Sequence, residues 1–509
     1  MHLLLLVMMF ACIRAVRGAP LLPSIVAAPF LKQNVSTRTL TPVPSIDFFS
    51  HSIRVLPHFS TVDESDATMV TMVTKGEYKT WIKSMNNEVL KWFDLTGFDL
   101  KEFPGNGKII YVPTVDSNGK LVMDTPSIVG FCDEKEIAKN NPRAFGDLFS
   151  NLLKGRDQCF YFVSSNEEAL GEKESNILAF QYGLHQYKFA VPLGFKSSPS
   201  TSKNTSNATI LWPKNCDKQK ISGLLKAYTL YKDLVDSPAL SCGPEQIEVT
   251  ARNVAENYNA TFHSIKGVEE LLLHNFPQIA AVGMAAARDR EPRIIDIKWR
   301  NNNDPNSNVD VVLIGKGVTF DTGGLDIKSS AGMRHMKKDM AGSAQALALG
   351  LLIMETNLPV NLRILLPIAE NSISGNALRP GDIIRSRHGK TIEITNTDAE
   401  GRLILSDAIA AAVEEGVGIY PNKKPALIVD FATLTGAARV ALADIPALFS
   451  NDISKAMNLW KISTDCHDLL WPMPLHEPFR DNLKSNVADI GKHLHLTQQS
   501  VLTLTRNCL

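Results

Sequence analysis

A chain of 509 residues is long enough for two or three domains that each bury a core of their own. Apolar residues make up 44% and charged residues 21%, as in an ordinary globular protein. The 53 lysine and arginine residues balance 53 aspartate and glutamate residues. This balance excludes a global attraction to nucleic acid or to an anionic membrane, so the function must come from a local site.

The first 46 residues are predicted to be a targeting segment. An apolar run occupies residues 3–13, Arg14 and Arg17 follow it, and no acidic residue precedes Asp47. The run is too short to span a bilayer as a helix, but it has the length of a signal-peptide core. The alternatives are an organellar transit peptide and a disordered extension without a targeting role.

The sequence does not decide between a secretory and an organellar compartment. Seven scattered cysteines form no CxxC pair and no dense framework. Such a set predicts mostly free thiols, which suit a reducing compartment better than an oxidising one.

Residues 47–215 are predicted to form a smaller N-terminal α/β domain. Strand-like segments at 108–115 and 158–165 alternate with helix-like ones. A polar stretch at 196–209 follows and is expected to be an exposed loop.

Residues 221–509 are predicted to form a larger α/β domain. Helices are expected at 223–239, 244–258, 331–356 and 403–415. Buried strands are expected at 278–283, 293–299, 308–317, 360–369, 391–395 and 426–434. Continuous apolar strands that alternate with helices indicate a mostly parallel central sheet flanked by helices.

Residues 315–328, GKGVTFDTGGLDIK, place charged side chains where a predicted buried strand ends. Four glycines in this segment allow sharp turns and a close approach to a bound group. Ligands of open α/β sheets collect at the carboxyl ends of strands, which makes Lys316, Asp321 and Lys328 candidate site residues. The alternatives are a glycine-rich turn with solvated charges and a phosphate cradle, and the missing Walker spacing disfavours the cradle.

Residues 396–403, NTDAEGRL, follow another predicted strand. If the extended backbone continues, Asp398, Glu400 and Arg402 project from one face. Two carboxylates so close repel each other unless a cation or a proton intervenes, and hard divalent cations prefer such oxygen ligands. Taken alone, an Asp-x-Glu pair is more often a solvated turn.

Asp339 is a further acidic candidate, in the first half of a predicted helix. An acidic residue at such a place is more often an exposed charge than a ligand. Its neighbours Lys337 and Lys338 suit that alternative.

Together these segments resemble the leucyl (cytosol) aminopeptidase family of two-zinc metallopeptidases, most of all its bacterial peptidase-B-like branch. GKGVTFDTGGLDIK, MKKDMAG (336–342) and NTDAEGRL occur in the family's order and spacing. The resemblance covers about residues 221–489 and includes LVDSPA (234–239), ENSISGNALRPGDI (370–383) and FATLTGAARVALAD (431–444). It implies a metal-dependent aminopeptidase with a leucine-type preference, which acts on peptides with a free N-terminus. The family is mostly cytoplasmic and hexameric.

The resemblance also implies two divalent metal ions per chain, with Zn²⁺ expected and Mn²⁺ or Co²⁺ as alternatives. It assigns five metal ligands, Lys316, Asp321, Asp339, Asp398 and Glu400. The tighter ion would use all of these except Asp398. The more exchangeable ion would use Asp321, Asp398 and Glu400.

Two catalytic residues and a substrate pocket are implied in the same way. Lys328 would polarise the scissile carbonyl, and Arg402 would hold a bicarbonate that serves as general base. The pocket for the first side chain would use Met336, Thr433, Leu434 and Gly436. For Met336, a place in the core is the alternative.

After Asp489 the sequence departs from the family. IGKHLHLTQQSVLTLTRNCL stands where a glycine-rich loop, a helix and a late strand are expected. The family's closing segment contributes to the sheet, the pocket and the hexamer. The catalytic domain is therefore expected to be incomplete, with a homo-hexamer only if this end permits it. The alternative function is a catalytically impaired isoform that acts as a structural or assembly subunit.

No basic patch supports nucleic-acid binding, and no second apolar run predicts a stable membrane span.

Overall fold

The computed structural model describes residues 48–50, 59–135, 145–154, 156–187, 189, 208–301, 309–414, 425–465 and 468–491. The predicted targeting segment, residues 196–207 of the predicted polar loop and the atypical sequence after residue 491 lie outside the described residues. Among the helices that the structure describes, none is long and apolar enough to cross a membrane.

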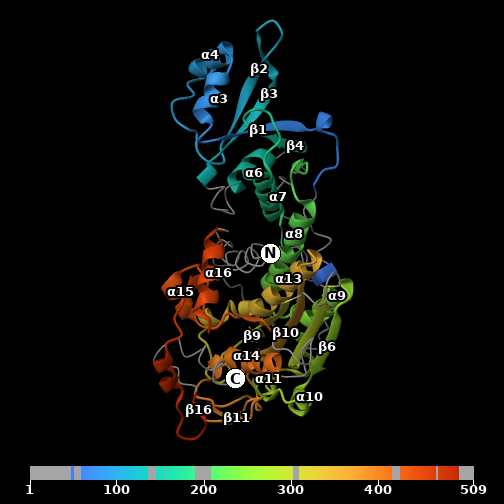
Figure 1. Cartoon of the computed structure of the whole chain (residues 1–509), viewed down its shortest axis with the longest axis vertical. Coiled ribbons are helices and arrows are strands. Elements are labelled where there is room, and N and C mark those ends of the chain that lie inside the picture. The colour runs from blue at the N-terminus through green and yellow to red at the C-terminus, as the bar shows by residue number, and fades with distance from the viewer. Residues whose placement is uncertain are drawn as a thin grey trace, which may run out of the picture.

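The N-terminal half contains a five-stranded sheet (Figure 1). Its strands are β1 (Thr68–Thr74), β2 (Ile109–Val115), β3 (Leu121–Cys132), β4 (Cys159–Val163) and β5 (Thr209–Ile210), in the order β2-β3-β1-β4-β5. Only β2 pairs antiparallel, with β3. The helical elements are η2 (Glu64–Asp66), α3 (Tyr78–Ser84), α4 (Asn87–Thr96), α6 (Gly146–Leu153) and α7 (Glu172–Gln186). The strands predicted at 108–115 and 158–165 are confirmed.

Helices cover both faces of this sheet because successive strand residues point to opposite sides. Phe131 packs with Tyr78 of α3 in one apolar cluster. Ile128 packs with Phe149 of α6 and Tyr182 of α7 in another. The N-terminal half is therefore a three-layer α/β unit.

The second half is built on a larger, six-stranded sheet. Its strands are β6 (Thr261–Lys266), β7 (Arg293–Arg300), β8 (Val309–Gly315), β9 (Gly317–Asp321), β10 (Val360–Asn371) and β13 (Leu427–Phe431), in the order β13-β8-β10-β7-β6 with β9 beside β10. Only β7 runs against the others, so the mostly parallel sheet is confirmed. Short strands are β11 (Ile383–Arg385), β12 (Thr391–Glu393), β14 (Ala447–Leu448), β15 (Trp471–Pro472) and β16 (Ile490–Gly491).

Helices flank this sheet (Figure 1). They are α8 (Lys218–Asp236), α9 (Pro244–Asn257), α10 (Val268–Leu273), α11 (Pro277–Gly283), α12 (Ser330–Met333), α13 (Ala341–Glu355), α14 (Gly401–Val413), α15 (Gly436–Leu442) and α16 (Ile453–Asp465). Shorter 3₁₀ segments are η3 (Arg288–Arg290), η4 (Met336–Met340), η5 (Thr397–Ala399) and η6 (Glu477–Leu483). Every residue of α13 up to Met354 is buried, which explains why this helix is apolar on all sides.

Two predicted elements are wrong. The strand expected at 278–283 is helix α11, which starts at Pro277, a residue suited to a first helical position. A short buried apolar run does not by itself distinguish a strand from a helix. The single helix expected at 331–356 is three pieces, α12, η4 and α13, and η4 packs against β9 of the sheet.

A buried carboxylate fastens α11 to α14. Asp407 Oδ2 accepts hydrogen bonds from the main-chain N–H groups of Gln278 and Ile279 at 2.8 and 3.1 Å. Its Oδ1 accepts from Gln278 Nε2 at 2.8 Å and from the Arg387 N–H at 3.3 Å. Burial raises the pKa of Asp407 to about 6 in spite of these donors.

We expect Asp407 to make stability depend on pH. A carboxyl whose pKa is higher in the folded than in the unfolded chain binds more protons when the chain is folded. Its contribution to the free energy of unfolding therefore falls as the pH rises from about 4 to about 6. The total decrease is at most about 3 kcal/mol. Asp407→Asn removes this titration, and the buried Gln278 Oε1, which has no hydrogen-bond partner among the residues that the structure describes, can accept from the new amide. The difference in urea midpoint between the two proteins should change across this interval and stay constant above pH 7. The same pH dependence in both proteins would contradict the raised pKa.

Candidate metal centre

Lys316 lies between β8 and β9, at the carboxyl end of a buried strand. Its main-chain N–H donates to the Phe431 carbonyl at 2.9 Å, which fixes the backbone against β13. The side chain is 1% exposed. Its Nζ lies 2.7 Å from Asp339 Oδ2 and 3.0 Å from Glu400 Oε1, and it donates to the Thr433 carbonyl at 2.9 Å. Lys316 therefore joins three chain segments in the interior.

Asp321 ends β9 and is followed by a glycine turn. Gly323 and Gly324 have φ values of +87° and +66°, a region that favours glycine. Asp321 Oδ1 accepts from the Gly323 N–H at 2.9 Å and from Asn371 Nδ2 at 2.8 Å. Its Oδ2 lies 2.8 Å from Lys328 Nζ. The turn thus orients the carboxylate and brings Lys328 back to it.

Asp339 lies in η4 and is buried, with 2% exposed. Its Oδ1 accepts from Thr433 Oγ1 at 2.8 Å, and its other oxygen faces Lys316. The alternative of an exposed charge is therefore wrong. Residues three apart in a 3₁₀ helix share a face, so partly buried Met336 lies on the same side as Asp339.

The extended conformation expected for residues 396–402 is wrong. Asp398 lies within η5, and Glu400 immediately precedes α14. The Asn396 side chain accepts from the Asp398 N–H at 2.6 Å and so starts the 3₁₀ turn. Oxygens of Asp321, Asp398 and Glu400 nevertheless lie within 4.8 Å of one another. The two carboxylates of NTDAEGRL converge because the chain turns there.

The charges around these carboxylates are incompletely balanced. Burial raises the pKa of Asp339 to about 7 and that of Asp398 to about 6, although lysines lie beside both. Burial disfavours the charged forms of Lys316 and Lys328, but contacts with the carboxylates outweigh it and place both pKa values above their usual range. Partly buried Lys338 and buried Arg402 also lie close enough to act electrostatically on Asp339, Asp321 and Glu400. In spite of these cations, Asp339 and Asp398 keep raised pKa values, so the packed carboxylates are not fully stabilised as anions by the protein alone. The donor set therefore fits divalent cations, which prefer such oxygen ligands.

The remaining predicted residues surround this cluster to different extents. Arg402 is 5% exposed, and its Nε has no hydrogen-bond partner among the described residues. Thr433 contacts both Lys316 and Asp339. Leu434 packs against an apolar cluster that includes residues of α11, α14 and the central sheet. Gly436 is exposed at the start of α15, and no contact with the carboxylates is seen for it.

Three supporting residues were missed by the sequence analysis. Asn371, at the end of β10, donates to Asp321 Oδ1. Thr397 Oγ1 donates to the Gly323 carbonyl at 2.6 Å and joins the two ligand segments. A Cβ on Gly401 would lie 2.5 Å from Lys316 Cε. Asn371 and Thr397 lie within the segments that resemble the family, and this position is the sequence signal that could have identified them as supporting residues.

Gly401→Ala is expected to displace the end of Lys316 and to weaken metal binding by about 10–100-fold. Gly350→Ala is the matched control, because its Cβ would press on Ile364 Cδ1 at 2.2 Å, in the core and away from the carboxylates. The control should lower the thermal midpoint and leave metal affinity unchanged. Calorimetric titration with Mn²⁺ separates the two variants. Equal loss of affinity in both would mean that packing in general, and not the lysine, is responsible.

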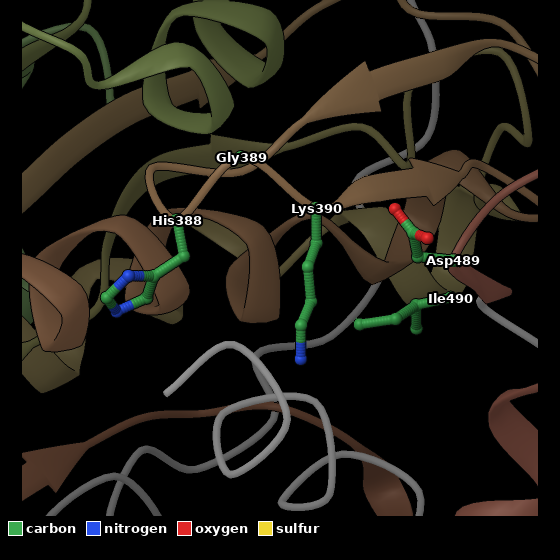
Figure 2. A pocket seen from close by; sticks show the side chains of 5 residues that line it. All are labelled: His388, Gly389, Lys390, Asp489 and Ile490. Carbon is green, nitrogen blue, oxygen red and sulfur yellow. The ribbon is translucent and has the colours of Figure 1, made fainter.

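A separate surface cavity has a volume of about 410 Å³. It is lined by His388, Gly389, Lys390, Asp489 and Ile490 (Figure 2). His388 and Lys390 project from one turn, and Asp489 accepts from the Thr391 N–H at 2.8 Å. None of the carboxylates of the candidate metal centre lines this cavity.

Comparison with known sequences identifies the family. Residues 229–504 match the catalytic domain of the cytosol aminopeptidase family. The chain is 37% identical over 324 residues to peptidase B of Yersinia pestis, a match that covers 63% of this chain and 72% of that protein. It is 40% identical over 265 residues to a probable cytosol aminopeptidase of Chromobacterium violaceum, which covers 52% of this chain and about half (48%) of that relative.

Comparison with solved structures gives the same family. The cytosol aminopeptidase of Coxiella burnetii superposes with a TM-score of 0.72 at 33% identity, covering 89% of this chain and 90% of that one. The bottromycin maturation enzyme BotP in complex with Mn superposes with a TM-score of 0.68 at 25% identity, covering 87% and 90%. The fold is that of an aminopeptidase. The chain belongs to the cytosol aminopeptidase family, so the resemblance seen in its sequence is confirmed.

Proposed function

We propose that this chain is a metal-dependent aminopeptidase that releases N-terminal amino acids, with a leucine-type preference, from peptides. The observation that carries the proposal is the convergence of Asp321, Asp398 and Glu400 within 4.8 Å, beside buried Lys316 and Asp339. A relative with manganese bound supports metal dependence. The proposed assembly is the homo-hexamer of the family.

The five polar residues of the cluster would hold two divalent ions, Zn²⁺ or alternatively Mn²⁺ or Co²⁺. When bound, such a pair supplies Lewis-acid chemistry and a water of lowered pKa. Lys316 can be a ligand only as a neutral amine, and an adjacent dication lowers the pKa of a lysine. Asp339 and Asp398, whose pKa values are raised without metal, would become fully ionised in that state.

The chain's own residues would then act on the scissile bond. Lys328 is 16% exposed in its side chain, so its ammonium can meet a substrate oxygen while it is held by Asp321 and Asp398. A preorganised positive charge stabilises the negative charge that develops on that oxygen. Arg402, whose Nε has no partner among the described residues, would hold a bicarbonate, which would supply a general base.

Substrate selection would fall to residues around this centre. Met336 shares the face of η4 with Asp339, and Thr433 contacts Lys316 and Asp339. We assign these two residues, with Leu434 and Gly436, to the pocket for the first side chain. A free substrate amine close to the carboxylates would account for removal of N-terminal residues alone.

The decisive experiment is an assay of the purified chain on leucine amide and on N-acetyl-leucine amide. We expect hydrolysis of the first substrate only, with Zn²⁺, Mn²⁺ or Co²⁺ present. A chelator should abolish activity, and added metal should restore it. Metal analysis should find two ions per chain. A folded chain that binds both ions and hydrolyses neither substrate would instead favour the role of an assembly subunit.

A further inference from the structure

The LVDSPA segment (234–239) is part of the family resemblance but contributes no residue to the candidate metal centre. It forms the end of α8 and the turn that follows. Two cationic side chains donate to its main-chain carbonyls: Lys337 Nζ to that of Asp236, and Arg290 Nη2 to that of Ala239 at 2.9 Å. The last carbonyls of a helix carry partial negative charge and attract cations.

Lys337 belongs to η4, between Met336 and Asp339. Short 3₁₀ segments have poor hydrogen-bond geometry, so the position of such a segment depends on contacts from outside it. Thr433 holds Asp339 from one side through its hydroxyl. Half-buried Lys337 holds the same segment from the side of α8.

α8 is a firm support for this contact. It lies beside α13 (Figure 1), and Lys226 of α8 pairs with Glu355 of α13 at 2.5 Å. Near its carboxyl end, Asp233 Oδ1 accepts from Tyr187 Oη at 2.8 Å. The carbonyl of Asp236 therefore has a fixed place relative to the central sheet.

The turn after α8 is held independently. Besides contacting the Ala239 carbonyl, Arg290 pairs with Glu370. Glu370 directly precedes Asn371, which donates to Asp321 Oδ1 at 2.8 Å. The turn is thus linked through Arg290 to the end of β10, whose Asn371 contacts the carboxylate of Asp321.

We propose that Lys337 is a positioning residue, which docks η4 on the carboxyl end of α8 and thereby sets the places of Asp339 and Met336. This inference rests on the proposed function, because it assigns the support of that metal centre. Lys337 contacts neither metal nor substrate in this role. Removal of its ammonium should disturb metal binding and the substrate pocket together, with kcat/KM reduced partly through KM.

The test compares Lys337→Met, which keeps the aliphatic stem, with Lys337→Arg, which keeps a charged donor. Lys226→Met is the control, since it also breaks a half-buried contact of α8. We expect Lys337→Met to weaken Mn²⁺ binding, measured by calorimetric titration, by about 10–100-fold. Lys337→Arg should stay near wild type. Lys226→Met should lower the thermal midpoint without changing Mn²⁺ affinity.

Each result has one meaning. If wild type binds no Mn²⁺, the proposed function fails first. If wild type binds Mn²⁺ and Lys337→Met binds it equally well, the inference is overturned. The inference also fails if Lys226→Met weakens Mn²⁺ binding as much as Lys337→Met, or if Lys337→Arg does not restore affinity. If Lys337→Met does not fold, Lys337→Gln, which keeps a neutral donor, replaces it in the test. Mn²⁺ affinity equal to wild type in that variant would likewise overturn the inference.

Discussion

Glu400→Ala is expected to abolish metal binding and to reduce kcat/KM by at least about 10³-fold, since metal ions supply several kcal/mol of transition-state stabilisation. Glu400 is 4% exposed, pairs with Lys316 and faces Asp321 and Asp398. Its removal takes an oxygen donor from the middle of the cluster. Metal content and leucine amide hydrolysis measure the two effects.

A matched control uses Glu393, which accepts from Ser485 Oγ outside the cluster. Glu393→Ala should keep both metal and activity. The thermal midpoint without metal shows whether Glu400→Ala is folded, because the substitution removes both repulsion among the carboxylates and a buried contact with Lys316. A metal-loaded, active Glu400→Ala protein would show that this carboxylate is not a ligand.

Lys328→Met is expected to keep both ions and lose about 10²–10³-fold in kcat, the usual cost of removing one donor to a developing oxyanion. KM should change little, because the lost contact exists mainly in the transition state. Lys316→Met is the informative comparison: both lysines touch two carboxylates, but Lys316 is 1% exposed and is the proposed ligand. The Lys316→Met variant should therefore lose bound metal.

The roles of the two lysines would have to be exchanged if Lys328→Met lost metal and Lys316→Met kept it. Both measurements use metal content, so neither depends on residual activity. Thermal midpoints taken without metal show whether each variant is folded.

Most strands around the site could be predicted from the sequence because their apolar runs are long and bounded by turns. β7, β8, β10 and β13 lie where they were expected. The run at 278–283 was too short to separate strand from helix, and α11 was missed.

The site was predicted in its residue types and not in its local geometry. The spacing of Asp398 and Glu400 indicated a shared strand face, whereas a cap from Asn396 bends the chain into η5 and brings the carboxylates together by another route. Contacts such as Asn371 with Asp321 join residues far apart in the chain. No local pattern encodes such a contact, which depends on sheet order.

The four carboxylates of the candidate metal centre come from three separate segments: the end of β9, η4, and the stretch from η5 to the start of α14. No short stretch of chain therefore carries more than two of them. Under the proposed function, the unfolded chain is therefore a poor chelator, and the ions bind almost only the native state. By mass action, a free ion at 100 times its Kd then adds about 2.7 kcal/mol to the free energy of unfolding. If the chain binds metal as proposed, the supply of metal in the surroundings therefore sets the stability of the fold as well as the rate of the reaction.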